Sequence, residues 1–184
     1  MKNIKKIKHM FLNSGFRYDL LVDEYSDKYF EYVLQNHISG QMKVAPEHVS
    51  NKVLHLMNKP NVEIYKEFVK RFNRINKRIN KRQFLVNYFI SAHPGSNLDD
   101  AYALAKYCQN VNIQPEQIQD YTPLPMTISS CMYYTGMNPF TNKKVYNPNS
   151  IKQRKMQRAL VQNRNPKNKI FLKEALKILK RSKI

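Results

Sequence analysis

The run QFLVNYFI at residues 83–90 decides the fold class, together with the residues SAHPG at positions 91–95. The run is nearly continuously apolar, which is typical of a parallel strand covered on both faces. Pro94 and Gly95 then end the strand, and Asn97 is a suitable N-cap for a helix over residues 98–109. This order of strand, turn and capped helix predicts a βα unit.

The same alternation of short apolar runs and helical periodicity extends over the rest of the chain. Four alternations with short connections predict an α/β fold of parallel strands, whose chemistry lies at the carboxyl ends of the strands. Those ends are expected at residues 13–15, 45–48, 91–95 and 122–125. Strands are predicted at residues 7–12, 40–45 (stopped by Pro46), 83–90 and 118–121, and helices at residues 27–37, 50–58, 61–79, 98–109, 127–135, 151–162 and 166–181.

Composition excludes several classes of protein. The chain has 184 residues, 42% of them hydrophobic, which is too apolar for a disordered basic tail and enough for one core. Its two cysteines are too few for a disulfide-rich scaffold or a four-cysteine zinc site. The sequence has no Walker A, G-x-S-x-G or G-x-G-x-x-G motif. It shows neither an apolar stretch that could cross a membrane nor a signal peptide, so we expect a cytoplasmic protein.

The net charge of +19 is concentrated in two segments. Residues 66–82 carry eight Lys and Arg against one acid, and residues 143–184 carry 14 against one. Two solvated helical faces explain this pattern, and nucleic-acid binding through residues 143–184 is the alternative. A membrane-surface patch is less favoured, because neither segment has a wide apolar face opposite its charges.

Polar side chains cluster where two predicted strands end. Gln41 and Lys43 alternate along one strand and therefore share a face, and Glu47 follows shortly after. A ligand would give these polar groups partners, whereas the alternative is an ordinary exposed strand. His93 and Gly95 form either a close backbone approach to a ligand or an ordinary βα turn. Cys108 is expected in the core, and the surroundings of Cys131 do not indicate a nucleophile.

Longer strings resemble the C-terminal half of YgiQ-type radical SAM proteins, over roughly residues 10–179. The most specific is CMYYTGMNPFT at residues 131–141, which has no generic structural explanation. The other strings are HISGQMKVAPEH (37–48), SNKVLHLMNKP (50–60), YFISAHPG (88–95), QDYTPLP (119–125), MQRAL (156–160) and NPKN (165–168).

The resemblance implies a partial (βα)6 barrel that binds a [4Fe–4S] cluster and S-adenosylmethionine (SAM), whose cleavage yields a radical that abstracts hydrogen. Residues 1–126 would supply the last four βα units of the barrel, and residues 127–184 a basic helical C-terminal extension. By the same resemblance, strand ends contact SAM through Gln41, Lys43, Glu47, Ile90, Ser91, His93, Gly95 and Thr122.

The chain departs from this family in one respect, because it has no C-x3-C-x2-C motif to ligate the cluster. We therefore expect a truncated or split form that is inactive alone and that pairs with a separate N-terminal half. An incomplete parallel sheet exposes an edge and uncovered helix faces, which predicts a marginal, aggregation-prone monomer. Whether the chain is part of an enzyme is left open, and the alternative function is a basic RNA-binding module.

Overall fold

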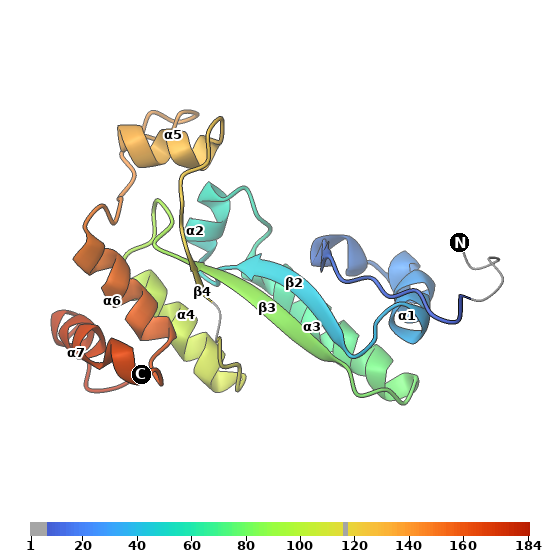
Figure 1. The fold of residues 1–184 in the computed structure, drawn as a ribbon. Helices are drawn as coiled ribbons and strands as arrows, with labels where there is room; N and C mark the ends of the chain where they lie inside the picture. Colours follow the sequence, from blue (N-terminus) through green and yellow to red (C-terminus); the bar gives the residue numbers. More distant parts are fainter. Residues whose placement is uncertain (1–6, 116–117) are drawn as a thin grey trace. The chain divides into compact units, whose positions relative to one another are not determined.

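The computed structural model describes residues 7–115 and 118–184 and is mixed α/β, with four parallel strands in the order β1-β2-β3-β4 (Figure 1). Gly15 pairs with Lys43 at one edge of the sheet, and Ser91 pairs with Asp120 at the other. The parallel α/β prediction is confirmed. In chain order the strands are β1 (Gly15–Phe16), β2 (Gln41–Glu47), β3 (Phe84–Ser91) and β4 (Ile118–Asp120).

Seven α-helices accompany the sheet within the described residues, and most lie within one or two residues of their predicted positions. Three begin at residues whose side chains accept a hydrogen bond from a backbone N–H in the first turn: Asn97, which is the predicted N-cap, and Thr127 and Ser150, which were not predicted as caps. The helices are α1 (Asp27–Asn36), α2 (Asn51–Leu56), α3 (Val62–Arg78), α4 (Leu98–Asn110), α5 (Ile128–Thr135), α6 (Ile151–Val161) and α7 (Lys169–Ile178), with 3-10 turns η1 (Tyr18–Leu21), η2 (Glu24–Ser26) and η3 (Pro166–Asn168).

The chain divides into two compact units. One contains the described part of Met1–Pro46 together with Glu63–Asn87, and its core is aromatic. Phe30 of α1 stacks on Phe68 of α3, with ring centroids 5.5 Å apart. Such ring pairs add stability beyond the burial of their apolar area. The i, i+4 spacing of the buried aromatic side chains on α3 therefore fixes how α1 and α3 pack.

The second unit contains Glu47–Val62 and Tyr88–Ile184. Its core lies between β3, β4 and the helices α4 and α6, and a second cluster joins α4, α6 and α7, which lie side by side in Figure 1. Buried Ala101 and Ala105 on α4, and Ala175 on α7, let both helices pack closely against α6. The predicted basic extension therefore packs on the α/β part through an apolar face.

The N-terminal strand prediction is wrong. Residues 7–12 are exposed and are not a strand, and pairing begins only at Gly15 and Phe16. The backbone of the segment bonds to His37 instead: the Leu12 N–H donates to the His37 carbonyl at 2.9 Å, and His37 Nδ1 lies 2.8 Å from the Met10 carbonyl oxygen. An apolar segment forms a strand only where a neighbouring strand offers backbone hydrogen bonds, and residues 7–12 have no such neighbour within the described part of the chain.

Two further strand predictions need correction. Pro46 does not stop β2, which continues to Glu47 with Pro46 buried in it. β3 is not covered on both faces along its length, because Phe84 is 66% exposed and only Phe89 and Ser91 are buried. Apolar composition alone does not separate a fully covered strand from one with an open face.

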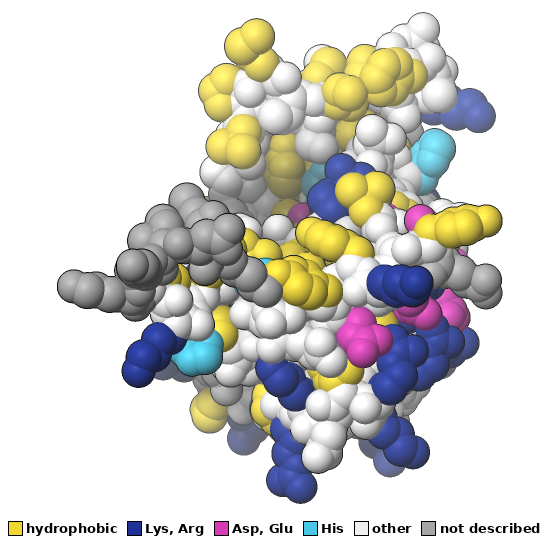
Figure 2. All heavy atoms as spheres, turned by 90° about the vertical axis from the view of Figure 1, so that its right-hand side faces the viewer, with side chains coloured by type: hydrophobic (Ala, Val, Ile, Leu, Met, Phe, Trp, Pro, Cys, Tyr) yellow, Lys and Arg dark blue, Asp and Glu magenta, His cyan; other side chains and the backbone are white. Residues whose placement is uncertain are grey.

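The basic segment at residues 66–82 is partly neutralised by ion pairs. Arg71 and Arg74 of α3 pair with Asp27 of α1, Arg78 pairs with Glu31, and Arg71 is only 4% exposed. Figure 2 shows Lys and Arg side chains over the lower part of one face, with acidic side chains beside some of them. These ion pairs therefore reduce the cationic character of the segment without removing it.

We predict that Gly95→Ala lowers the free energy of unfolding by about 1–3 kcal/mol. Gly95 has φ of +90°, a conformation that disfavours an L side chain, and a Cβ there would lie 2.2 Å from Leu56 Cδ1. Gly15→Ala is the matched control, because no atom lies within 4 Å of a Cβ at that position. Urea unfolding measures both variants, and an equal effect in the two would contradict the prediction.

Candidate functional site

The carboxyl ends of β2 and β3 are held in a strained backbone conformation. Glu47, the last residue of β2, has φ of 66°, and Ala92, directly after β3, has φ of 60°. Non-glycine residues in this region cost free energy and persist only when their surroundings hold them. Strain of this kind is concentrated at functional sites, so these strand ends are the candidate functional site.

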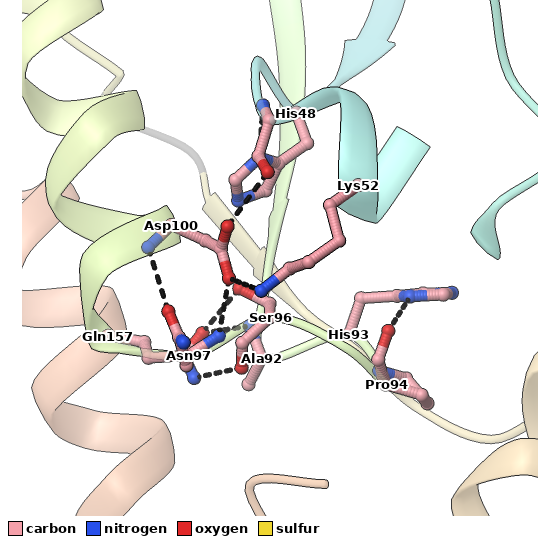
Figure 3. Close-up of polar contacts among 10 residues, drawn as sticks. His48, Lys52, Ala92, His93, Pro94, Ser96, Asn97, Asp100 and Gln157 are labelled. Carbon is pink, nitrogen blue, oxygen red and sulfur yellow. Dashed lines mark hydrogen bonds and ion pairs between the residues drawn. The ribbon is translucent and has the colours of Figure 1, made fainter. Parts of the chain in front are cut away.

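One carboxylate connects the segments around this site (Figure 3). Asp100 in the first turn of α4 accepts a hydrogen bond from Ser50 Oγ at 2.8 Å and lies 2.7 Å from Lys52 Nζ. It also accepts from the Asn97 N–H at 3.0 Å, while the Asn97 side chain accepts from the Asp100 N–H. Asp100 is 9% exposed, so its bonds join the beginnings of α2 and α4 within the interior.

Burial of Asp100 alone raises its pKa, because water is removed from the charged form. The hydrogen bond from Asn97, together with Lys52 and Ser50, more than offsets this effect. The pKa of the Asp100 carboxyl therefore lies below its usual range, and the group is ionised at neutral pH.

The hydrogen bonds of two buried histidines, His48 and His93, determine which ring nitrogen carries the proton. His48 Nδ1 accepts from the Ser50 N–H at 3.0 Å, so the neutral ring carries its proton on Nε2. His93 Nδ1 lies 2.7 Å from the Pro94 carbonyl and therefore donates, which leaves Nε2 to accept from Ser129 Oγ at 2.8 Å. Burial lowers the pKa of each ring to about 4, so both are neutral at pH 7.

The turn after β3 is clamped by Gln157 of α6. Its Oε1 accepts from the Ala92 N–H at 3.1 Å and from Ser96 Oγ at 2.9 Å, while its Nε2 donates to the Ser96 carbonyl at 2.6 Å (Figure 3). Gln157 is 1% exposed. A buried carboxamide with three hydrogen bonds fixes its neighbours, so Gln157 holds the strained Ala92 backbone in place.

Two arginines of α6 bind the end of β4. Arg154 donates to the Tyr121 carbonyl, and Arg158 Nη1 lies 3.1 Å from Asp120 Oδ2. Asp120 Oδ1 also accepts from Ser91 Oγ at 2.5 Å, which joins β3 to β4 through side chains. Arg154, Gln157 and Arg158 were not predicted, although their i, i+3, i+4 spacing on an otherwise apolar helix face is the sequence signal that could have found them.

The eight predicted SAM contacts are distributed over both units. Gln41 and Lys43 belong to the first unit and project from the same side of β2, opposite the buried Met42 and Val44. The remaining six lie in the second unit: Glu47, Ile90, Ser91, His93, Gly95 and Thr122.

Several of these six already have intramolecular partners. The hydroxyl of Ser91 bonds to Asp120, both ring nitrogens of His93 are engaged, and the Gly95 N–H donates to the Tyr146 carbonyl at 2.6 Å. Thr122 is exposed, with its hydroxyl 3.3 Å from the Asp120 carbonyl oxygen, and Ile90 is half-buried.

Glu47 also has an intramolecular partner, because its carboxyl oxygen Oε1 lies 3.3 Å from Lys59 Nζ. Burial raises the pKa of Glu47 despite the opposing effect of Lys59. A half-buried carboxylate at a strand end fits a ligand ammonium group such as that of SAM. The residues present therefore fit SAM mainly through Glu47, with His93 and Gly95 shaping the turn.

The described residues do not fit an iron–sulfur cluster. Cys108 is buried in the core, as predicted, and burial raises its pKa to about 12. Cys131 is exposed on α5. Within residues 7–115 and 118–184, no three His, Cys, Asp or Glu side chains are grouped so that they could hold a metal ion. Cluster chemistry would need ligands from elsewhere.

Comparison with known proteins identifies longer relatives. Residues 116–184 match a family described as a domain of unknown function, DUF3362. UPF0313 proteins of Methanocella arvoryzae, Clostridium botulinum strain 657 and Clostridium perfringens are 46%, 48% and 46% identical over 176 residues. The alignments cover 96% of this chain but 29%, 28% and 27% of those proteins. The chain thus resembles a C-terminal portion of UPF0313 proteins.

Each of these relatives is therefore more than three times as long as the segment that it shares with this chain. Among the helices of the described residues, none combines the length and apolar character needed to cross a membrane.

We predict that stability falls between pH 7 and pH 4.5 through His48 and His93. In this range the unfolded chain, with histidine pKa values near 6.5, binds protons that the folded rings, with pKa values of about 4, do not accept. As the pH falls from 7 to 4.5, each ring therefore lowers the free energy of unfolding by on the order of 2–3 kcal/mol. In urea unfolding, the free energy of unfolding of His93→Gln should decrease less over this range than that of the unmodified chain.

Exposed His55→Gln is the control and should leave the decrease unchanged. Equal decreases in all three proteins would contradict a role of the buried His93 ring in the pH dependence.

Proposed function

We propose that this chain is the C-terminal portion of a YgiQ-like radical SAM protein, in which it contributes strand ends that bind SAM. A separate or preceding cluster-binding part would complete a (βα)6 barrel. In the proteins that the chain resembles, cluster-bound SAM supplies a radical that abstracts hydrogen from a substrate. A cytoplasmic location belongs to the same proposal, because clusters and free thiols such as Cys108 and Cys131 need a reducing compartment.

The observation that carries this proposal is the pair of strained strand ends at Glu47 and Ala92. They end neighbouring parallel strands, and ligands of parallel α/β folds bind outside the carboxyl ends of the strands. Glu47 provides a carboxylate for the SAM amino group, and Gln157 and Asp100 hold the backbone around it. The length of the UPF0313 relatives supports the part of the proposal that places further residues beside this segment.

In this proposal the chain's own residues bind and orient the ligand. Burial raises the pKa of the Glu47 carboxyl, and the nearby Lys59 ammonium group opposes this rise without cancelling it. His48 and His93 remain neutral at pH 7 and so add no positive charge beside the sulfonium of SAM. Gln41 and Lys43 lie on the less buried face of β2 in the first unit, and this face is left for contacts with the completing part.

The test is whether this chain forms an iron-binding complex with the part of a UPF0313 protein that lies outside the matched segment. The chain is co-expressed with the portion of the Clostridium botulinum UPF0313 protein that lies outside the matched segment, followed by anaerobic reconstitution with iron and sulfide. We expect a co-purifying pair that holds iron and binds SAM in equilibrium dialysis. Glu47→Gln should weaken SAM binding roughly tenfold, the loss of one charge-assisted hydrogen bond, with unchanged iron content.

Glu63→Gln is the matched control, because Glu63 is exposed on α3 and outside the strand ends. A pair that loads iron but binds SAM equally well with Glu47→Gln would overturn the role of Glu47. Failure of the two parts to co-purify and load iron would overturn the proposed function.

RNA binding by the C-terminal helices is a second candidate function, favoured by one observation on α7. Lys169, Lys173 and Lys177 recur every four residues on α7 and form one exposed stripe, and exposed Lys180 follows just after the end of the helix. Among the described residues, none of these four lysines has a carboxylate within ion-pair distance, in contrast to the paired basic residues of α3. An unneutralised row of lysines is suited to a phosphate backbone.

A further inference from the structure

A cavity of about 290 Å³ lies in the second unit where α4 and α6 end. Its floor includes Cys108, Ile113 and Val161, which also belong to the apolar core. α4 begins beside the strand ends and is 13 residues long, so its far end lies roughly 20 Å from the candidate site. The cavity is therefore separate from the residues proposed to bind SAM.

Side-chain carboxamides dominate the rim of this cavity. Within the described part of the chain, the structure gives no hydrogen bond to the side chains of Gln109, Asn112 and Gln114, all of which are exposed. Each carboxamide offers both donor N–H groups and an acceptor oxygen. None of the described lining side chains is a carboxylate. The rim thus has unused hydrogen-bonding capacity around an apolar floor.

Positive charge adjoins the same rim. Arg164 lines the cavity and is exposed, and Lys167 follows Asn165, which also lines it. The Asn165 side chain accepts from the Lys167 N–H at 3.0 Å and so fixes the start of η3 next to the cavity. One cationic side chain, that of Arg164, therefore lines the cavity, and a second, that of Lys167, follows the lining segment in the sequence.

We propose that this cavity binds a single unstacked nucleobase of an RNA strand. Carboxamides pair with base edges through adjacent donor and acceptor groups, and the apolar floor covers the face of the ring. Ligand pockets usually measure about 300–1,000 Å³, so a volume at the lower limit suits one base rather than two. Arg164 and Lys167 hold the flanking phosphates. This inference rests on the second candidate function, RNA binding, and specifies that a nucleobase of the RNA enters the cavity.

The test measures binding of fluorescein-labelled 12-nucleotide homopolymers of A, C, G and U by anisotropy, with adenosine, cytidine, guanosine and uridine monophosphates as competitors. The chain should prefer one homopolymer, and the matching monophosphate should compete. Substituting both Asn112 and Gln114 by Ala should weaken binding of that homopolymer about tenfold and leave the others nearly unchanged. Arg164→Ala should weaken all four and lessen the dependence on salt.

Asn73→Ala is the matched control, because Asn73 is an exposed carboxamide of α3 in the other unit. Binding of monophosphates without any binding of RNA would overturn the claim that the bound nucleobase belongs to an RNA strand. Salt-dependent RNA binding that is equal for all four homopolymers and insensitive to Asn112 and Gln114 would overturn the cavity while leaving the lysine stripe as the binding surface. Absence of both kinds of binding at low salt would overturn the proposal and the second candidate function together.

Discussion

The buried carboxylate of Asp100 is the interaction on which the candidate site depends. It receives a hydroxyl, an ammonium group and a backbone N–H from the beginnings of α2 and α4, which follow the ends of β2 and β3. Removing one partner of such a network leaves the others buried without compensation, which is costly. The hydrogen bond from the Ala92 N–H to Gln157 explains how Ala92 remains in a backbone conformation that most residues avoid.

Local signals in the sequence predicted most of the elements, because helices and strand positions follow from short-range physics. Asn97 caps its helix as expected, since the cap and the first-turn Asp100 are only three residues apart. Residues 7–12 were predicted wrongly because a strand exists only where a neighbour supplies hydrogen bonds. The exposure of Phe84 was missed for a related reason, since burial depends on what covers the sheet.

The location of the candidate site was predictable, but its supporting residues were not. The ends of parallel strands meet at one edge of a sheet whatever their sequence, which places Glu47 and His93 at that edge. The contacts of Asp100 with Ser50 and of Gln157 with Ala92 span 50 and 65 residues. No local pattern specifies such pairs. The UPF0313 relatives extend well beyond the segment that they share with this chain.

The most direct measurement is amide hydrogen exchange in the unmodified chain, in Asp100→Asn and in Asp99→Asn. Asp99 is exposed and lies in the same first turn of α4, so its substitution changes the helix terminus without touching the network. If Asp100 joins the two strand ends, Asp100→Asn should lower protection at least tenfold both in the first turn of α2 and in residues 92–97, and Asp99→Asn should lower neither. Loss of protection confined to the first turn of α4, or equal losses in the two variants, would contradict this account.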